Sequence, residues 1–307
     1  MAIVRSSPLP GVAASPPFPL GVRATAEERS VPLWLWWNLL SLDAPSVAVL
    51  WAILFARVSG TRWNPWEALA LALVVWLVYV ADRLLDARWP GREALRARHL
   101  FCKKHAAVFL SAMAGAAALL ALVVFFRLSH GVVWNGTRMG LLVGAYMIGI
   151  HIRPLRLVRS VPKELFVGVL FAAGTTLPQW TSAQGVSGFD VFSWILFALV
   201  CALNCAAIEY WEGHPGAAAS GPATHGLALR SAAGVARPAL FLASLCFACA
   251  LLPQAAHVVP AFLAAGMAAL CLLLIDGYKA QLSLPALRVL ADAALVFPAL
   301  LILGLQR

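Results

Sequence analysis

Long apolar runs recur along the chain and are separated by shorter polar segments. A run of about 17–25 apolar residues is long enough to cross a lipid bilayer as a helix. These runs are continuous and lack the alternation of apolar and polar residues that strands of a membrane barrel require. The pattern predicts an all-α, polytopic membrane protein with nine transmembrane helices, at residues 33–57, 66–84, 105–126, 138–152, 164–181, 189–210, 236–253, 258–276 and 286–305.

The first 30 residues have a different character from the rest of the chain. They contain five prolines between Pro8 and Pro19 together with scattered charges. Such a segment cannot bury enough apolar surface to fold, and it has no apolar core of the kind that a signal peptide needs. We therefore expect residues 1–30 to form a disordered cytoplasmic tail and residues 31–307 to form one membrane domain.

Composition and charge agree with this organisation. The chain is 62% apolar and 12% charged, whereas a soluble domain is about half apolar and a quarter charged. The net charge of +10 would fit a nucleic-acid partner, but most of the 23 Lys and Arg residues fall in alternate loops. Positive loops face the cytoplasm, so topology accounts for the charge without nucleic acid and predicts a cytoplasmic N-terminus.

Two carboxylates mark the predicted cytoplasmic end of the second span. Asp82 and Asp86 are four residues apart, which places both on one face of a helix. A charged side chain costs about 2.5–3.5 kcal/mol at the centre of a bilayer and less near its surface, so the pair needs a partner. That partner is a salt bridge to Arg83 or Arg88, water at the membrane surface, or Mg²⁺ shared with a substrate phosphate.

A second polar group lies at the end of the sixth span, on the same predicted side. It consists of Asn204, Glu209 and Glu212. Four helices separate it from the first group, a spacing that suggests a four-helix unit used twice in parallel orientation. Two such ends facing each other would form a carboxylate-lined cup that opens to the cytoplasm.

Basic residues follow the fourth span, again on the cytoplasmic side. Arg153, Arg156 and Lys163 can balance the charge of a diphosphate that Mg²⁺ bridges to the carboxylates. They can equally anchor the loop at an anionic lipid surface. The sequence alone leaves both interpretations open.

Two acids lie deeper in predicted spans. Asp43 precedes Ala44-Pro45 in the first span, so it either lines a site or caps a helix that restarts at the proline. For Asp292, in the ninth span, we expect a hydrogen bond between helices.

Together these residues resemble the UbiA superfamily of intramembrane prenyltransferases, over roughly residues 33–305. Asp82 and Asp86 match the aspartates of the family's first motif, N-x-x-x-D-x-x-x-D, and Arg156 takes the place of its donor-contacting basic residue. The chain departs from the family at Val78, which replaces the asparagine of that motif. It departs again in the second motif, where Asn204, Glu209 and Glu212 replace the usual aspartates.

The resemblance implies a Mg²⁺-dependent enzyme of the bacterial cytoplasmic membrane. Such an enzyme moves a polyprenyl group from a polyprenyl diphosphate to an aromatic, quinone-precursor or other hydrophobic acceptor. On this basis the metal ligands are Asp82, Asp86, Glu209 and Glu212, the donor-binding residues are Arg153, Arg156, Lys163 and Asn204, and Asp43 orients the acceptor or acts as its base. The alternatives are a non-catalytic relative that binds a lipid diphosphate or a partner, and a small transporter that uses Asp43 and Asp292.

Overall fold

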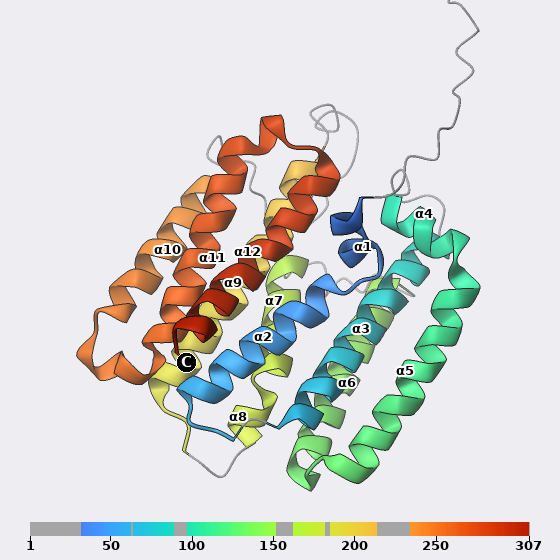
Figure 1. Cartoon of the computed structure of the whole chain (residues 1–307), viewed down its shortest axis with the longest axis horizontal. Coiled ribbons are helices and arrows are strands. Elements are labelled where there is room, and N and C mark those ends of the chain that lie inside the picture. Colours follow the sequence, from blue (N-terminus) through green and yellow to red (C-terminus); the bar gives the residue numbers. More distant parts are fainter. Residues whose placement is uncertain are drawn as a thin grey trace, which may run out of the picture. The chain divides into compact units, whose positions relative to one another are not determined.

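The computed structural model of the chain describes residues 32–62, 64–88, 97–151, 162–181, 185–213 and 234–306. Contacts divide the chain into Met1–Pro32 and Leu33–Arg307, and all described helices lie in the second unit. No strand occurs among the described residues. The helices are α1 (Leu33–Leu39), α2 (Asp43–Val58), α3 (Pro65–Arg88), α4 (Ala97–Lys104), α5 (Ala106–Arg127), α6 (His130–His151), α7 (Lys163–Thr175), α8 (Leu177–Thr181), α9 (Gly188–Glu212), α10 (Ala236–Ala250), α11 (Val259–Tyr278) and α12 (Leu284–Leu305) (Figure 1).

A helix or a pair of helices occupies each of the nine predicted ranges. Five helical segments are long and apolar enough to cross a membrane, and the bent pair α1–α2 makes a sixth if it counts as one span. The other helical segments of the described chain are shorter or less apolar; α7 has 13 residues and α10 has 15. The protein is therefore a helical membrane protein, while the count of nine spans and the cytoplasmic N-terminus stay predictions.

The predicted span over residues 33–57 is broken, and a second helix starts just before Pro45, as one of the two interpretations of Asp43 expected. The segment breaks between α1 and α2, which meet at a bend of 83°. Ser41 at the break has a φ of 60°, a left-handed conformation that is uncommon for a residue with a side chain. Pro45, in the first turn of α2, has no N–H to give to the preceding turn, so a new helix starts here instead of the old one continuing.

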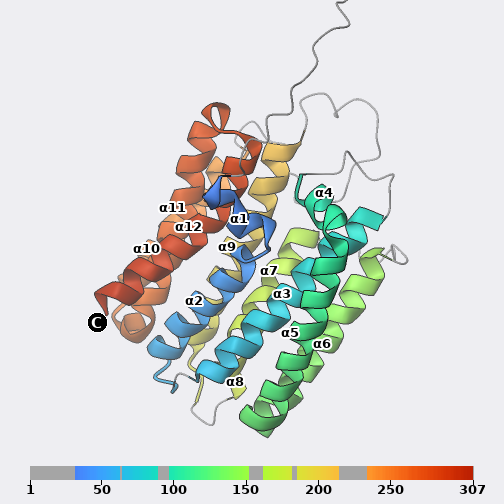
Figure 2. The ribbon, with the colours of Figure 1, turned by 45° about the vertical axis from the view of Figure 1, so that its right-hand side comes forward.

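The main core forms where α9, α11 and α12 pack with α2 and α10. Trp51 of α2 stacks on Phe197 of α9 with ring centroids 4.2 Å apart, and Phe262 of α11 is fully buried in the same cluster. Small residues of α11 such as Ala265 and Ala268 are also buried, and small side chains let neighbouring helices approach closely within a membrane. In both views α10–α12 lie on one side and α5 and α6 on the other, with α2, α3 and α7 between them (Figures 1 and 2).

Candidate functional site

Many polar residues of the described chain gather at the end of the bundle where α3 and α9 finish. Both helices run toward this end (Figure 1). Side-chain contacts bring the first residue of α7, the last turn of α11 and the first turns of α12 to the last turn of α9. We call this region the acidic end and define it by Asp82, Asp86, Lys163, Glu164, Asn204, Glu209, Glu212, Arg288 and Asp292.

Two tyrosines connect α3 and α6 to this region. Tyr79, one turn before Asp82 on α3, lies within electrostatic range of Asp43, Asp292 and Cys205. Tyr146 of α6 lies within the same range of Asp82, Glu164 and Cys205. Asp82 at the end of α3 and Cys205, which follows Asn204 on α9, therefore both lie near Tyr146. The sequence analysis missed both tyrosines, because each stands alone within an apolar run.

Asp82 and Asp86 lie on the last turns of α3, and both side chains are half-buried. Four residues along a helix correspond to about 6 Å of rise, so the two carboxylates are stacked one turn apart. Arg83 is adjacent to Asp82 in sequence, but consecutive residues of a helix point about 100° apart. Its side chain turns away to α1 and α2, as described below.

Glu209 of α9 pairs with Lys163, the first residue of α7. The Lys163 Nζ lies 2.9 Å from each oxygen of the Glu209 carboxylate. The Lys163 side chain is 52% exposed and that of Glu209 is 35% exposed, so the pair contributes at most about 1 kcal/mol to stability. A pair this weak can open when a more highly charged anion reaches Lys163.

Glu212 and Asn204 are held more firmly by α12. Arg288 donates from Nε to the Glu212 carboxylate, and both side chains are about nine-tenths buried. Asn204 donates to the Asp292 Oδ1 over 3.2 Å, which confirms the predicted hydrogen bond between helices. The buried Oδ1 of Asn204 accepts no hydrogen bond from the described residues. A buried acceptor of this kind normally has a partner, so the site offers an oxygen to a bound water or ligand.

Asp43 is the first residue of α2 and is only 4% exposed. Its Oδ2 accepts a hydrogen bond of 2.6 Å from the Asn38 side chain and lies 3.5 Å from Arg83, which is 2% exposed. Its Oδ1 lies 3.0 Å from the backbone nitrogen of Ala44. Arg83 also donates to the Asn38 carbonyl over 2.7 Å. Arg83 thus forms its salt bridge with Asp43 and not with Asp82 or Asp86. This salt bridge links the α1–α2 break to α3.

The described residues contain no group of three or more His, Cys, Asp and Glu side chains arranged to hold a metal ion. Two carboxylates nevertheless suffice for Mg²⁺, which usually keeps several waters and takes further oxygens from a substrate phosphate. Asp82 and Asp86 fit this requirement. Glu209 and Glu212 are bound to Lys163 and Arg288, so they do not offer a second set of this kind in the present arrangement.

Arg153 and Arg156, which we expected to bind the diphosphate of the donor, lie outside the described residues. No protein-family model matches the chain, and no curated protein or solved structure matches it.

Proposed function

We propose that this protein is a membrane prenyltransferase that binds a polyprenyl diphosphate at the acidic end and transfers the polyprenyl group to a hydrophobic acceptor. One observation carries the proposal. Carboxylates of α3, a weakly held lysine of α7 and an unsatisfied amide oxygen of α9 lie at the same end of an apolar helical bundle. A diphosphate with a long apolar tail matches this combination of charged end and apolar wall.

Acidic and basic side chains together bind the donor's diphosphate, the acidic ones through Mg²⁺. Asp82 and Asp86 would hold one Mg²⁺, which when bound neutralises negative charge on the diphosphate. Lys163 exchanges Glu209 for the diphosphate, and Arg153 and Arg156, which precede α7 in the sequence, would add positive charge. During transfer the bond between the allylic carbon and the diphosphate oxygen breaks, and its electron pair leaves with that oxygen. Lys163 stabilises the charge that develops there, while an electron pair of the acceptor forms the new bond to the carbon and the acceptor then loses its proton to water at the membrane surface.

The remaining polar residues position this machinery. The Asn204 amide donates to Asp292 and leaves its oxygen for water or substrate. Asp43 already accepts hydrogen bonds at both oxygens. We therefore assign Asp43 the role of fixing the α1–α2 junction against α3, in place of the role of base for the acceptor.

A second candidate function is binding of a lipid diphosphate without turnover. It is favoured by the ion pairs of Glu209 with Lys163 and of Glu212 with Arg288, which replace a second set of metal-binding carboxylates. Single-turnover assays with an acceptor separate the two candidates: the enzyme releases diphosphate, and the binding protein retains an intact donor.

The first test is binding of farnesyl diphosphate to the purified protein with and without Mg²⁺. In the double variant Asp82→Asn/Asp86→Asn we expect the Mg²⁺-dependent affinity to fall at least tenfold, about 1.4 kcal/mol, because both charged ligands are lost. Isothermal titration calorimetry in detergent micelles measures the change. Asp276→Asn serves as the control, since this carboxylate of the same end is bound to Trp211 and Lys279. Mg²⁺-independent binding to the wild type would contradict the proposal.

Lys163→Met provides a second, smaller test. The exposed pair with Glu209 contributes at most about 1 kcal/mol, so the variant should keep its stability. Its affinity for farnesyl diphosphate should fall about fivefold, because the cation that meets the diphosphate is gone. Lys279→Met removes a lysine of similar exposure that pairs with Asp276, and its affinity should not change. An equal loss in both variants would assign the effect to net charge instead of to Lys163.

A further inference from the structure

A polar cavity lies at the opposite end of the same helices from the acidic end. Its volume is about 380 Å³. Glu67 in the first turn of α3 lines it, 15 residues before Asp82, so the cavity is about 22 Å from the acidic end along the helix. The proposed function makes no use of it.

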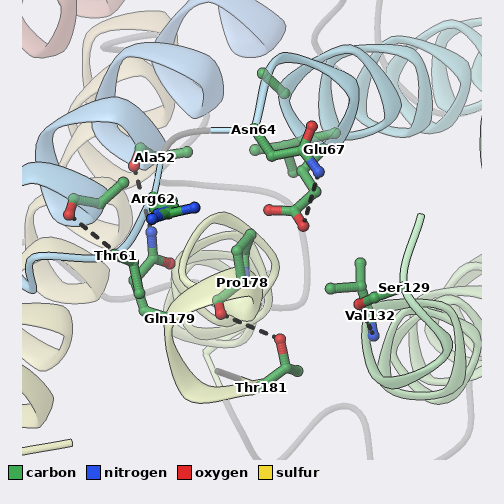
Figure 3. Close-up of a pocket in the computed structure, with 13 residues that line it drawn as sticks. Ala52, Thr61, Arg62, Asn64, Glu67, Ser129, Val132, Pro178, Gln179 and Thr181 are labelled. Carbon is green, nitrogen blue, oxygen red and sulfur yellow. Dashed lines mark hydrogen bonds between the residues drawn. The ribbon is translucent and has the colours of Figure 1, made fainter. Parts of the chain in front are cut away.

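Two opposite charges point into this cavity. Arg62, in the connection between α2 and α3, and Glu67, on α3, project into the same hollow (Figure 3). Within the part of the chain that the structure describes, no salt bridge joins the two side chains. Glu67 instead accepts a hydrogen bond of 3.2 Å from Asn64, which fixes its carboxylate in place. A cation and an anion that share a cavity without pairing favour a ligand that carries both charges.

The rest of the lining is mixed. Ala68 and Leu71 of α3 and Val132 of α6 form its apolar part, whereas Thr61, Ser129, Gln179 and Thr181 are polar. The volume lies within the usual range of about 300–1,000 Å³ for small-molecule sites. The cavity thus combines two opposite charges and further hydrogen-bonding groups with an apolar part, as a lipid headgroup and the start of its chains require.

Aromatic and basic residues place the cavity at the level of lipid headgroups. Trp66, next to Glu67, is 39% exposed and lies under the Arg127 guanidinium at 4.6 Å. Trp134 of α6 is also exposed and pairs with Arg138 in the same way. Exposed tryptophans concentrate where the hydrocarbon core meets water. Arginines at that depth meet lipid phosphates.

We propose that this cavity binds the headgroup of a phospholipid that carries a primary ammonium, with the phosphate at Arg62 and the ammonium at Glu67. The site is independent of the proposed function, because it is remote from the acidic end and requires no diphosphate. An ammonium that donates three hydrogen bonds suits a carboxylate better than a trimethylated one that donates none. The site therefore distinguishes phosphatidylethanolamine from phosphatidylcholine.

Native mass spectrometry of the full chain tests this assignment. The protein is released from vesicles that contain equal amounts of phosphatidylethanolamine and phosphatidylcholine with the same acyl chains. We expect the wild type to retain the ethanolamine lipid about tenfold over the choline lipid. Glu67→Gln should abolish this preference, whereas Lys279→Gln, which removes a charge at the opposite end of the helices, should keep it. Equal retention of the two lipids by the wild type overturns the proposal.

A second variant and a soluble competitor complete the test. Val132→Trp fills the cavity from its apolar side without changing a charge, so it should release the retained lipid even if Glu67→Gln folds poorly. Retention by a folded Val132→Trp protein overturns the assignment to this cavity. Soluble glycerophosphoethanolamine carries the same phosphodiester and ammonium without acyl chains and should not displace the lipid at millimolar concentration. Displacement would overturn the lipid assignment in favour of a free zwitterion.

Discussion

Arg83→Met is expected to lower the free energy of unfolding by about 3–5 kcal/mol, because it leaves the buried Asp43 carboxylate without its cation. Arg83 and Asp43 are 2% and 4% exposed and lie 3.5 Å apart. The Asn38 carbonyl also loses a charged hydrogen bond of 2.7 Å. Equilibrium unfolding in mixed micelles measures the change.

Arg57→Met is the matched control for this prediction. Arg57 lies near the other end of α2, is exposed and bonds only a backbone carbonyl among the described contacts, that of Leu303. Its replacement should cost less than about 1 kcal/mol. A double variant, Arg83→Met with Asp43→Asn, should cost less than the sum of the two single changes, since no charge remains buried alone. If Arg83→Met resembles Arg57→Met, the ion pair does not hold the α1–α2 break.

The positions of most helices follow from the sequence because lipid leaves the backbone no other way to satisfy its polar groups. Predicted 189–210 and 286–305 agree within two residues with α9 (Gly188–Glu212) and α12 (Leu284–Leu305). The helix predicted at 138–152 instead begins at His130. Asn135 and Gly136 interrupt the apolar pattern there and resemble a loop, but a helix satisfies its own backbone whatever side chains it carries.

For the candidate site, the sequence predicts where the acidic residues lie along the helices, but only the structure shows which residues they pair with. The sequence places Asp82, Asp86 and Glu209 at the ends of spans, because edge acids are visible as interruptions of apolar runs. It cannot supply their partners. Arg83 and Asp43 are separated by 40 residues, and Arg288 and Glu212 by 76 residues. Which of several nearby charges forms each pair depends on how the helices pack, and periodicity contains no information about that.

Close packing between α7 and α9 determines where Lys163 meets Glu209. Gly168 lies one and a half turns after Lys163 on α7 and faces α9. A methyl group added there would lie 2.4 Å from the Ala198 carbonyl oxygen and 2.9 Å from the Ala202 nitrogen. These are backbone atoms of α9, so neither can move without moving the helix. Only glycine permits this approach.

We therefore expect Gly168→Ala to lower the free energy of unfolding by about 3 kcal/mol, near the upper end of the usual cost of overpacking. Gly174→Ala is the control on the same helix, because a methyl group there meets nothing within 4 Å. Alanine also favours the helix, so this control should be neutral or more stable by up to about 1 kcal/mol. Equilibrium unfolding of both variants in the same micelles measures the difference. Equal stabilities would mean that α7 shifts freely against α9, in which case the contact between Lys163 and Glu209 is not fixed by the packing of these helices.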